Sequence, residues 1–515
     1  MKRPILSVVI TAHCEGLIAH KTVMSALAGL EKIKQSWEIV VNVDNGDKAT
    51  RNYFARYTKD PRFVINKTSL GDPGSARNAA IQVARGKYIT VLDGDDLLSS
   101  SFFEEFFRLV EAHPDKRIMV HPGATMQFGE NIPLTAWPQF DSDTLEKDAI
   151  KLVGVNRWTA SSAAEREVFL ESPYVPSVDG YGYEDWWLNQ QVVACGVTHY
   201  VADSVLFYRK KTSGSMFALH ENDRTVVAYT DLLALDRVKN IPLPPLERVR
   251  KMSAKGVAKR LIKLTYKAAI ALPVIKIPAL AMGRKAEKKV RERRYASLPQ
   301  FVLDGWAEAA EIENIIVKSP EAAEHIVYQS YEDDYIGIVY RHLVEHIDAR
   351  PVDRLYMMPG RMSGLEKKTL VRAIELDREK HPDWHIVVLT RLGDVEIDGV
   401  DFVDFSSIAR QLTPYEKDRM FSRLLVQLQT RDLVVGDSSF FLKWVADHKK
   451  FISSNSFHIM AMVFDDDSID PYLIDMYSML AKVITSDKRI IKRLVDRYAF
   501  DKSKIQGVDD AAKDT

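Results

Sequence analysis

Short β-branched runs alternate with helical patterns at the start of the chain. Residues 5–11 and 38–43 are two such runs, a helical pattern over 20–34 separates them, and a third run covers 88–92. Strands that alternate with helices predict a mostly parallel sheet with helices on both faces. Such sheets bind ligands at the carboxyl ends of their strands, and the segments that follow these runs are polar. These segments are 13–16, 44–47 and 93–96.

The same alternation returns near residue 352 and predicts a second α/β unit with a Rossmann-like sheet. Segments 415–430 and 488–499 carry apolar residues at helical spacing between strand candidates. The strand candidates are 354–359, 385–390, 432–437, 458–464 and 482–487. We therefore expect three units: an α/β domain over 1–240, a basic helical connector over 241–325 and a Rossmann-like domain over 326–515.

Composition supports this division into folded domains. A chain of 515 residues exceeds what one core usually organises, and 46% hydrophobic with 28% charged residues is ordinary globular usage. The 71 basic residues balance the 71 acidic ones, so we expect no nucleic-acid partner. Cys14 and Cys195 are isolated, which argues against a disulfide framework or a zinc site. The first residues lack the pattern of a secretion signal, and we expect a cytoplasmic protein.

Charge is uneven along the chain. Residues 248–294 hold sixteen Lys or Arg and two acids, and the apolar stretch 268–282 within them is too short to span a bilayer. Two interpretations stay open: contact with an anionic membrane surface, which would make the protein peripheral on the inner membrane, or a solvated connector that pairs with acidic faces of the neighbouring domains.

The densest chemical signal is the acid cluster after the third run. Asp93, Asp95 and Asp96 would repel one another unless a cation or hydrogen bonds offset their charge. Mn²⁺ or Mg²⁺ held by these three carboxylates would also seat a nucleotide diphosphate. Taken alone, the triplet is more typical of an exposed Asp/Gly-rich turn.

The surrounding residues resemble the family 2 glycosyltransferases of the GT-A fold. Gly71, Arg77 and Asn78 open a helical segment, Ala84-Arg-Gly-Lys-Tyr88 leads into the third strand, and Leu92 to Asp96 ends it in the family's acidic motif. The resemblance extends to Thr11–Glu15 and to Asp44–Asp47 after the first two strands. It implies a GT-A domain, a nucleotide-sugar donor and a divalent metal. The donor-binding residues that it implies are Thr11, Ala12, Glu15, Asp44, Arg77, Asn78, Asp93, Gly94 and Asp95.

The segment Tyr181 to Trp187 resembles the family's G-x-E-D-W motif. A sugar hydroxyl is a poor nucleophile, so a carboxylate must accept its proton, and Asp185 is the candidate base. Glu184 would bind the acceptor or hold Asp185, and Tyr183, Trp186 and Trp187 would contact the acceptor. The alternative is that Glu184 and Asp185 only complement a helix dipole.

After Tyr208 the family often carries a histidine that ligates the metal, whereas Lys211 stands here. Lys211 or Arg209 could instead neutralise the leaving diphosphate. Further along, 355–364 and 484–487 resemble the N-terminal half of a GT-B (family 4-like) glycosyltransferase, whose donor-binding half is missing. We therefore expect either a truncated bifunctional enzyme or a docking module.

Together these patterns predict inverting transfer of a sugar from a nucleotide diphosphate, most simply UDP, to a glycan or lipid-linked glycan acceptor. The resemblance places the reaction in bacterial surface polysaccharide synthesis of the O-antigen or capsule type. A sugar-phosphate nucleotidyltransferase is an alternative, although no Gly-rich triphosphate loop precedes a lysine near the N-terminus. A non-catalytic glycan-binding scaffold is the other.

Overall fold

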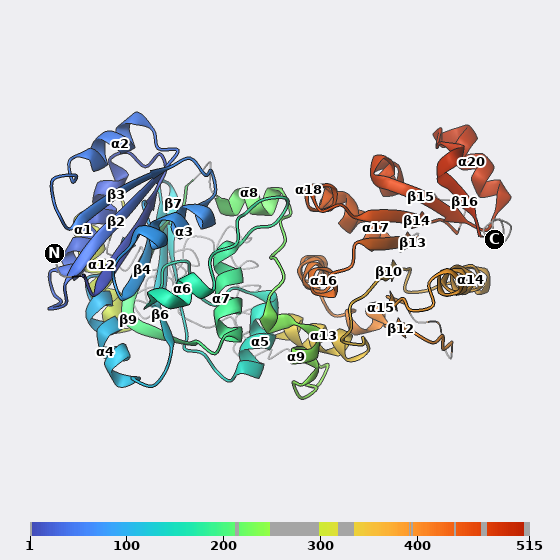
Figure 1. Cartoon of the computed structure of the whole chain (residues 1–515), viewed down its shortest axis with the longest axis horizontal. Coiled ribbons are helices and arrows are strands. Elements are labelled where there is room, and N and C mark those ends of the chain that lie inside the picture. The colour runs from blue at the N-terminus through green and yellow to red at the C-terminus, as the bar shows by residue number, and fades with distance from the viewer. Residues whose placement is uncertain are drawn as a thin grey trace, which may run out of the picture.

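Two α/β domains lie one after the other along the long axis of the molecule (Figure 1). The computed structural model describes residues 3–211, 216–247, 298–317, 334–390, 392, 395–436, 439–464 and 471–508. The basic segment 248–294 lies outside these residues. None of the described helices is both long and apolar enough to cross a membrane.

The N-terminal sheet is mixed and has the order β3-β2-β1-β4-β8-β6-β9-β5, with β7 paired to β6. The first four strands are parallel, β8 runs antiparallel to both β4 and β6, and β6 and β9 are parallel. The strands are β1 (Leu6–Ala12), β2 (Trp37–Asp44), β3 (Phe63–Thr68), β4 (Tyr88–Asp93), β5 (Leu97–Leu98), β6 (Ile118–Gly129), β7 (Ile132–Pro138), β8 (Ala163–Glu165) and β9 (Thr198–Arg209). The predicted fold class is thereby confirmed for this part of the chain.

Helices cover both faces of this sheet because each buried strand is apolar on both sides. In β1, Val8 and Ile10 pack with one set of helices and Val9 packs with the other. The first set is α1 (Ile18–Leu30), α2 (Lys48–Ala55) and α4 (Phe102–Ala112); the second is α3 (Pro73–Val83), α6 (Arg166–Glu171) and α7 (Glu184–Ala194).

Helix α12 (Gln300–Ile312) comes from the expected connector but belongs to the N-terminal core. Val302 and Trp306 are fully buried against Val205 and Phe207 of β9. This part of 241–325 therefore completes the first domain rather than bridging to the second. The shorter helices of this part of the chain are α5 (Leu145–Gly154), α8 (Met216–Asn222), η1 (Asp231–Leu233) and α9 (Leu235–Lys239).

The C-terminal sheet is parallel throughout, in the order β12-β11-β10-β13-β14-β15-β16. Its strands are β10 (Arg354–Met357), β11 (Ile386–Val388), β12 (Val400–Phe402), β13 (Asp432–Gly436), β14 (His458–Met462), β15 (Leu480–Thr485) and β16 (Ile505–Gly507). All five predicted strands are present, and a second Rossmann-like sheet is confirmed. The edge strands β12 and β16 escape prediction because three residues give no measurable periodicity.

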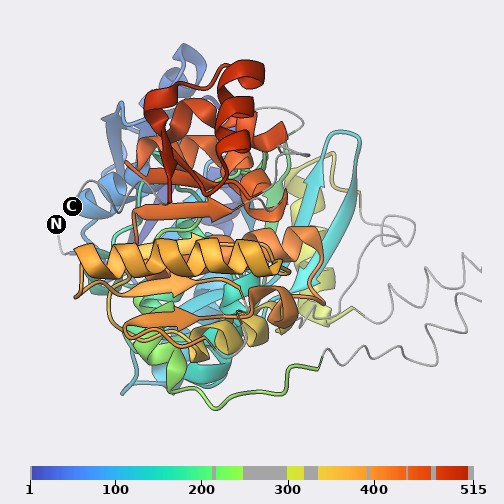
Figure 2. The same cartoon turned by 90° about the vertical axis from the view of Figure 1, so that its right-hand side faces the viewer.

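Helices also cover both faces of this second sheet. Helix α14 (Gly364–Lys380) lies across the face turned away from the first domain, where it is the long orange helix of Figure 2. The remaining helices are α13 (Tyr335–Glu345), α15 (Phe405–Ile408), α16 (Pro414–Leu428), α17 (Ser439–Asp447), α18 (Lys449–Ser454), α19 (Pro471–Asp475), α20 (Lys488–Tyr498) and the short η3 (Tyr477–Met479) and η4 (Lys502–Lys504).

The two domains share one apolar cluster through α5, α13 and α16. Leu152 of α5, Val339 of α13 and Leu424 of α16 are all fully buried in it. The two helices approach closely at Gly337, where an added Cβ would lie 1.8 Å from the carbonyl oxygen of Ile150. Only glycine allows α13 to pack backbone to backbone on α5. The domains are therefore joined by a packed interface rather than by a linker alone.

Candidate functional site

A cavity opens at the carboxyl ends of β1 and β4, where sequence analysis placed the site. The volume open to the centres of water molecules is about 420 Å³. We call it the strand-end cavity. Its lining is Thr11, Ala12, His13, Glu15, Asp44, Gly71, Asp72, Pro73, Ala76, Arg77, Asp93, Gly94, Asp95, Glu184, Tyr208, Arg209, Lys211, Met216 and Leu219.

Parallel pairing sets the two strand ends side by side. Thr11 of β1 is in register with Asp93 of β4, and its hydroxyl donates to Asp93 Oδ1 at 3.0 Å. Gly94 then turns the chain so closely over β1 that an added Cβ would lie 2.7 Å from the Thr11 carbonyl oxygen. The glycine between the acids is therefore required by the backbone itself.

Arg77 links the acid cluster to the start of α7. Its Nη2 donates to both oxygens of Asp93 at 2.9 Å, and its Nη1 donates to Glu184 Oε1 at 2.6 Å. The guanidinium is buried, and although burial alone would lower its pKa, the charges of Asp93 and Glu184 hold the pKa well above its usual value. Arg77 therefore stays charged and brings two distant motifs to one wall of the cavity.

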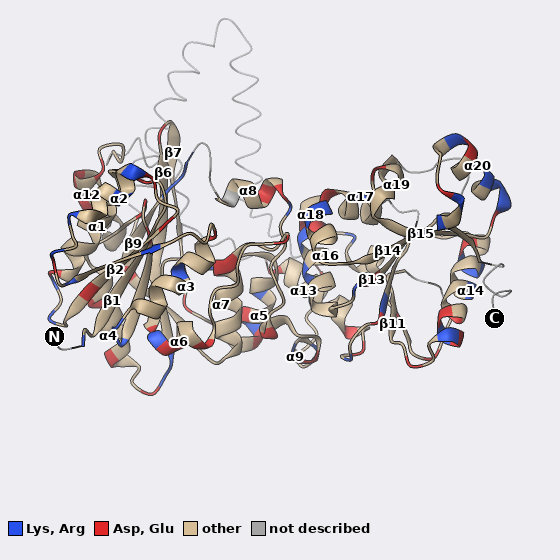
Figure 3. Ribbon diagram, turned by 45° about the horizontal axis from the view of Figure 1, so that its top comes forward, with Lys and Arg blue, Asp and Glu red and all other residues tan. Residues whose placement is uncertain are grey.

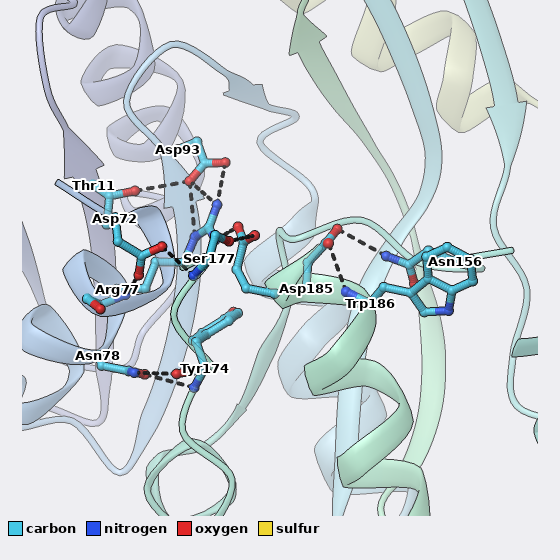
Figure 4. Close-up of polar contacts among 12 residues, drawn as sticks. Thr11, Asp72, Arg77, Asn78, Asp93, Asn156, Tyr174, Ser177, Asp185 and Trp186 are labelled. Carbon is cyan, nitrogen blue, oxygen red and sulfur yellow. Dashed lines mark hydrogen bonds and ion pairs between the residues drawn. The ribbon is translucent and has the colours of Figure 1, made fainter. Parts of the chain in front are cut away.

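Asp185 points away from this network (Figure 4). Its Oδ2 accepts from Asn156 Nδ2 at 3.0 Å, and its Oδ1 accepts from the backbone N–H of Trp186 at 2.8 Å. Burial and, next, the neighbouring charge of Glu184 raise the pKa of Asp185 to about 7. Asp185 does not line the strand-end cavity, whereas Glu184 does. Of the predicted pair, one carboxylate is tied to Arg77 and the other is held nearby with a raised pKa.

Asp44 organises the loop between β3 and α3. It accepts from the Thr68 hydroxyl and from the backbone N–H groups of Leu70 and Gly71, at 2.7, 2.7 and 2.8 Å. Burial would raise the pKa of Asp44, but these hydrogen bonds lower it, so the carboxylate is ionised. Asp72 then caps α3 at the Ser75 N–H and also accepts from the Ser177 N–H. The loop is thus fixed as part of the cavity wall.

The three acids at the end of β4 do not converge on one point. Asp93 faces Arg77, Asp95 forms an ion pair with Lys211 at 2.8 Å, and Asp96 accepts from the Arg209 backbone N–H at 2.8 Å. Burial, followed by the charges of Asp95 and Asp93, raises the pKa of Asp96 well above its usual value. Over the described residues, no group of three or more His, Cys, Asp or Glu is placed to hold a metal. The three carboxylates therefore contact three different partners, and their role as a shared metal site stays a prediction.

Asp95 alone still fits a divalent ion. Its carboxylate lines the cavity, and Mg²⁺ or Mn²⁺ is commonly held by one or two carboxylates together with substrate phosphates. Burial raises the pKa of Asp95, while the Lys211 ammonium opposes that rise. Lys211 Nζ also lies 3.5 Å from Glu15 Oε1. The Lys211 ammonium, at the end of a flexible side chain, therefore lies between the carboxylates of Asp95 and Glu15.

Arg209 is anchored by a residue that sequence analysis missed. Its guanidinium pairs with Glu313, directly after α12, and its Nε donates to the Asp95 carbonyl oxygen at 3.1 Å. Lys21 of α1 also pairs with Glu313, at 2.7 Å. Burial alone would raise the pKa of Glu313, but the hydrogen bonds from Lys21 and Arg209 lower it. No local motif marks Glu313, because its role depends on α12 packing back onto β9.

Four expected binding residues face elsewhere. Asn78 exchanges two hydrogen bonds with the backbone of Tyr174 and does not line the cavity, so its expected place along the nucleotide is corrected to a structural one. The indole N–H groups of Trp186 and Trp187 donate to the carbonyl oxygens of Leu152 and Tyr229.

Tyr183 adopts a left-handed φ of 59° before α7 and turns toward the second domain, where it lines a different recess. Tyr183, Trp186 and Trp187 therefore do not line the strand-end cavity, and their contact with an acceptor stays a prediction. The sequence motif fixes which residues start the helix, but not which way each side chain turns.

Other lining residues were not predicted as ligand contacts. Pro73 and Asp72 belong to the start of α3, and Met216 and Leu219 belong to α8. Asp72 and Pro73 could have been identified from the sequence, because an N-cap residue followed by proline after a strand is typical of the start of a helix. The second pair carries no such signal.

The chain was compared with known proteins. Residues 7–171 match the model of the family described as glycosyl transferase family 2. An uncharacterized glycosyltransferase of Methanocaldococcus jannaschii is 32% identical over 117 residues, which are 22% of this chain and 40% of that protein. The minor teichoic acid biosynthesis protein GgaB of Bacillus subtilis is 32% identical over 101 residues, 19% of this chain and 11% of that protein.

An uncharacterized protein of Sinorhizobium fredii is 40% identical over 73 residues, 14% of this chain and 8% of that protein. The chain thus spans well under half the length of these curated relatives. Among solved structures, residues 1–349 of S. aureus TarS in complex with UDP-GlcNAc align with a TM-score of 0.35 at 17% identity, covering 60% of this chain and 89% of that one. The family match includes the carboxyl ends of β1, β2 and β4 and the helix α3, which form much of the wall of the strand-end cavity, and it identifies residues 7–171 as a glycosyl transferase family 2 domain.

Proposed function

We propose that this chain transfers a sugar from a nucleotide diphosphate donor, UDP in the simplest case, to a glycan or lipid-linked glycan acceptor. The observation that carries the proposal is the Asp93–Arg77–Glu184 bridge, which joins the acidic strand end and the Glu-Asp motif at one cavity. The family match over residues 7–171, which includes Arg77 and Asp93, supports the reaction class.

The donor would lie across the ends of β1, β2 and β4. Ala12, Glu15 and Asp44 line the part of the cavity nearest the first two strands and would receive the base. Lys211 and Arg209 line the cavity near the end of β9, where Lys211 lies 3.5 Å from Glu15, and would face the diphosphate. Asp95 would hold Mn²⁺ or Mg²⁺ together with phosphate oxygens, and such an ion would neutralise charge on the leaving group.

Asp185 is the proposed base. Glu184 is already engaged by Arg77 and by the Ser177 hydroxyl, at 2.6 and 3.3 Å, so its role is to position the acceptor side of the site. A carboxyl with a pKa of about 7 accepts a proton effectively near neutral pH. The acceptor oxygen would attack the anomeric carbon opposite the nucleotide as Asp185 takes its proton, which inverts that carbon.

The acceptor class and the cellular setting extend this proposal. A glycan or lipid-linked glycan acceptor agrees with a role in the synthesis of a bacterial surface polysaccharide. The basic residues 248–294 would bring the enzyme to an anionic membrane that carries such a lipid-linked glycan. Flotation with anionic liposomes at low and high salt tests the membrane contact: recovery with the lipid only at low salt supports it, and no recovery at either salt contradicts it.

A panel of UDP-sugars with Mn²⁺ tests the reaction itself. Release of UDP together with a mass increase of one sugar on the acceptor is the expected result, and Asp95→Ala should lose it. Release of pyrophosphate from a nucleoside triphosphate and a sugar phosphate would instead identify a nucleotidyltransferase. Glycan binding without turnover of any donor would identify a scaffold.

A further inference from the structure

A second recess lies between the two domains, apart from the strand-end cavity. The volume open to the centres of water molecules is about 40 Å³, enough for a few waters or one tetrahedral oxyanion and too small for a sugar ring. Its walls come from α7 and the residues after α8 in the first domain and from α16 in the second. We call it the interdomain recess. Its charged and aromatic lining is Tyr183, Trp186, His220, Glu221, Arg224, Tyr415, Asp418, Arg419, Arg423 and His448.

Arg423 is the unusual residue of this lining. It is 4% exposed, and neither of its terminal guanidinium nitrogens, Nη1 and Nη2, has a hydrogen-bond partner. The guanidinium carbon lies 4.2 Å from the centre of the Trp186 ring, a contact that offsets part of the cost of burial. Burial and, next, the charge of Arg419 lower the pKa of Arg423 to about 9. Burying a cation without an anion costs free energy. The simplest physical explanation is that Arg423 pairs with an anion that binds to the protein.

The acids of the recess are committed to other groups. Glu221 Oε1 accepts from the Tyr183 hydroxyl at 2.7 Å and from Arg419 Nη2 at 3.0 Å. Burial raises the pKa of Asp418 to about 6, and its Oδ2 lies 3.8 Å from His448 Nε2. No carboxylate of the described residues forms an ion pair with Arg423.

Basic segments of α16 and α18 lie along the border with the first domain (Figure 3). Arg419 and Arg423 are four residues apart on α16 and therefore share one face of that helix. Both guanidinium groups stack on Trp186, at 5.4 and 4.2 Å from the ring centre. They present a paired set of N–H donors to the same small space, an arrangement suited to the oxygens of a phosphate group.

We propose that the interdomain recess binds a phosphate group between Arg423 and Arg419. The group would supply the anion that Arg423 lacks, and Trp186 would form the floor beneath it. Because Trp186 directly follows Glu184 and Asp185, an occupied recess would also fix the start of α7 against α16. The proposal concerns binding alone and stands independently of the proposed sugar transfer.

Binding of inorganic phosphate to the full chain tests the proposal. Calorimetry and thermal melts would compare phosphate with chloride at equal ionic strength. We expect phosphate to raise the melting temperature of the wild type, and Arg423→Met to weaken phosphate binding by about tenfold or more, as expected for a lost charge-assisted hydrogen bond. Arg410→Gln, an exposed arginine of the same domain, should bind phosphate as the wild type does.

Two further measurements distinguish the interdomain recess from the strand-end cavity, and the free phosphate ion from a phosphate ester. Lys211→Met should retain the binding, because that residue lines the strand-end cavity and not the recess. Glycerol 3-phosphate identifies the source: tighter binding than inorganic phosphate indicates a phosphate ester such as a phosphorylated glycan, and weaker binding indicates the free ion. Phosphate binding that survives in a folded Arg423→Met variant, or no phosphate effect beyond that of chloride, would overturn the proposal.

Discussion

Arg77 Nη1 lies 2.6 Å from Glu184 Oε1 and joins the first turns of α3 to the start of α7 across 107 residues of sequence. The same guanidinium holds Asp93 at the end of β4. This one buried cation therefore converts two separate motifs into a single site.

Replacement of Arg77 by Met should destabilise the fold and impair donor binding. The change leaves Asp93 and Glu184 without their counterion in a buried setting, which typically costs about 3–5 kcal/mol. Denaturant unfolding measures this loss. Arg108→Met is the matched control, because Arg108 forms an exposed ion pair with Glu105 and its loss should change stability by less than about 1 kcal/mol. Equal stability of the two variants would contradict the bridge.

Gly94→Ala should distort the strand-end cavity. The added Cβ would lie 2.7 Å from the carbonyl oxygen of Thr11, a backbone atom that moves only if β1 and β4 shift. We expect a loss of about 1–3 kcal/mol in the free energy of unfolding and weaker UDP binding. Gly364→Ala has no atom within 4 Å of the new Cβ and serves as control. A Gly94→Ala variant with wild-type UDP affinity would contradict a donor site at this turn.

Lys211→Met should weaken UDP binding by about ten- to a hundredfold if its ammonium meets the diphosphate. The neighbouring Lys210→Met is the control, since Lys210 is exposed and does not line the cavity. Isothermal titration with UDP at two salt concentrations provides the readout. Equal affinities for the two variants would show that Lys211 serves only to balance Asp95 and Glu15.

The raised pKa of Asp185 predicts the pH dependence of transfer. Because the base acts only when ionised, kcat/KM should fall by about tenfold per pH unit below about pH 7. An acidic limb centred near pH 4 would contradict the assignment.

The same pKa shift predicts how stability changes with pH. The native state retains a proton that the unfolded state releases above its usual pKa of 3.8, so the wild type should lose stability relative to Asp185→Asn as the pH rises from about 4 to 7. Urea unfolding of both proteins across that range measures it. A stability difference that does not change with pH would contradict a raised pKa.

Much of the fold follows from local patterns. The parallel strands β1, β2 and β4 and all five predicted C-terminal strands are visible as β-branched runs, because strands buried on both faces are apolar throughout. Strands β3 and β5 to β9 of the first domain were not predicted, nor were β12 and β16, which are too short for periodicity. The rule that ligands bind at the carboxyl ends of parallel strands correctly placed the cavity, because this rule depends only on the topology of the sheet.

Side-chain direction and long-range packing were not predictable. Asn78 and Trp187 match a motif yet turn to backbone carbonyls, and only the tertiary neighbours decide that choice. Glu313 reaches Arg209 because α12 folds back on β9, and Gly337 reflects the contact of α13 with α5. Each of these features involves segments that no local periodicity relates.

The central claim is that Asp185 accepts the acceptor's proton beside a donor held at the strand-end cavity. The most direct measurement is sugar transfer and UDP affinity for Asp185→Asn, side by side with the wild type. We predict that transfer falls by about 10² to 10⁴ while UDP affinity stays unchanged. Transfer at the wild-type rate, or a loss of UDP affinity as large as the loss of transfer, would contradict the account.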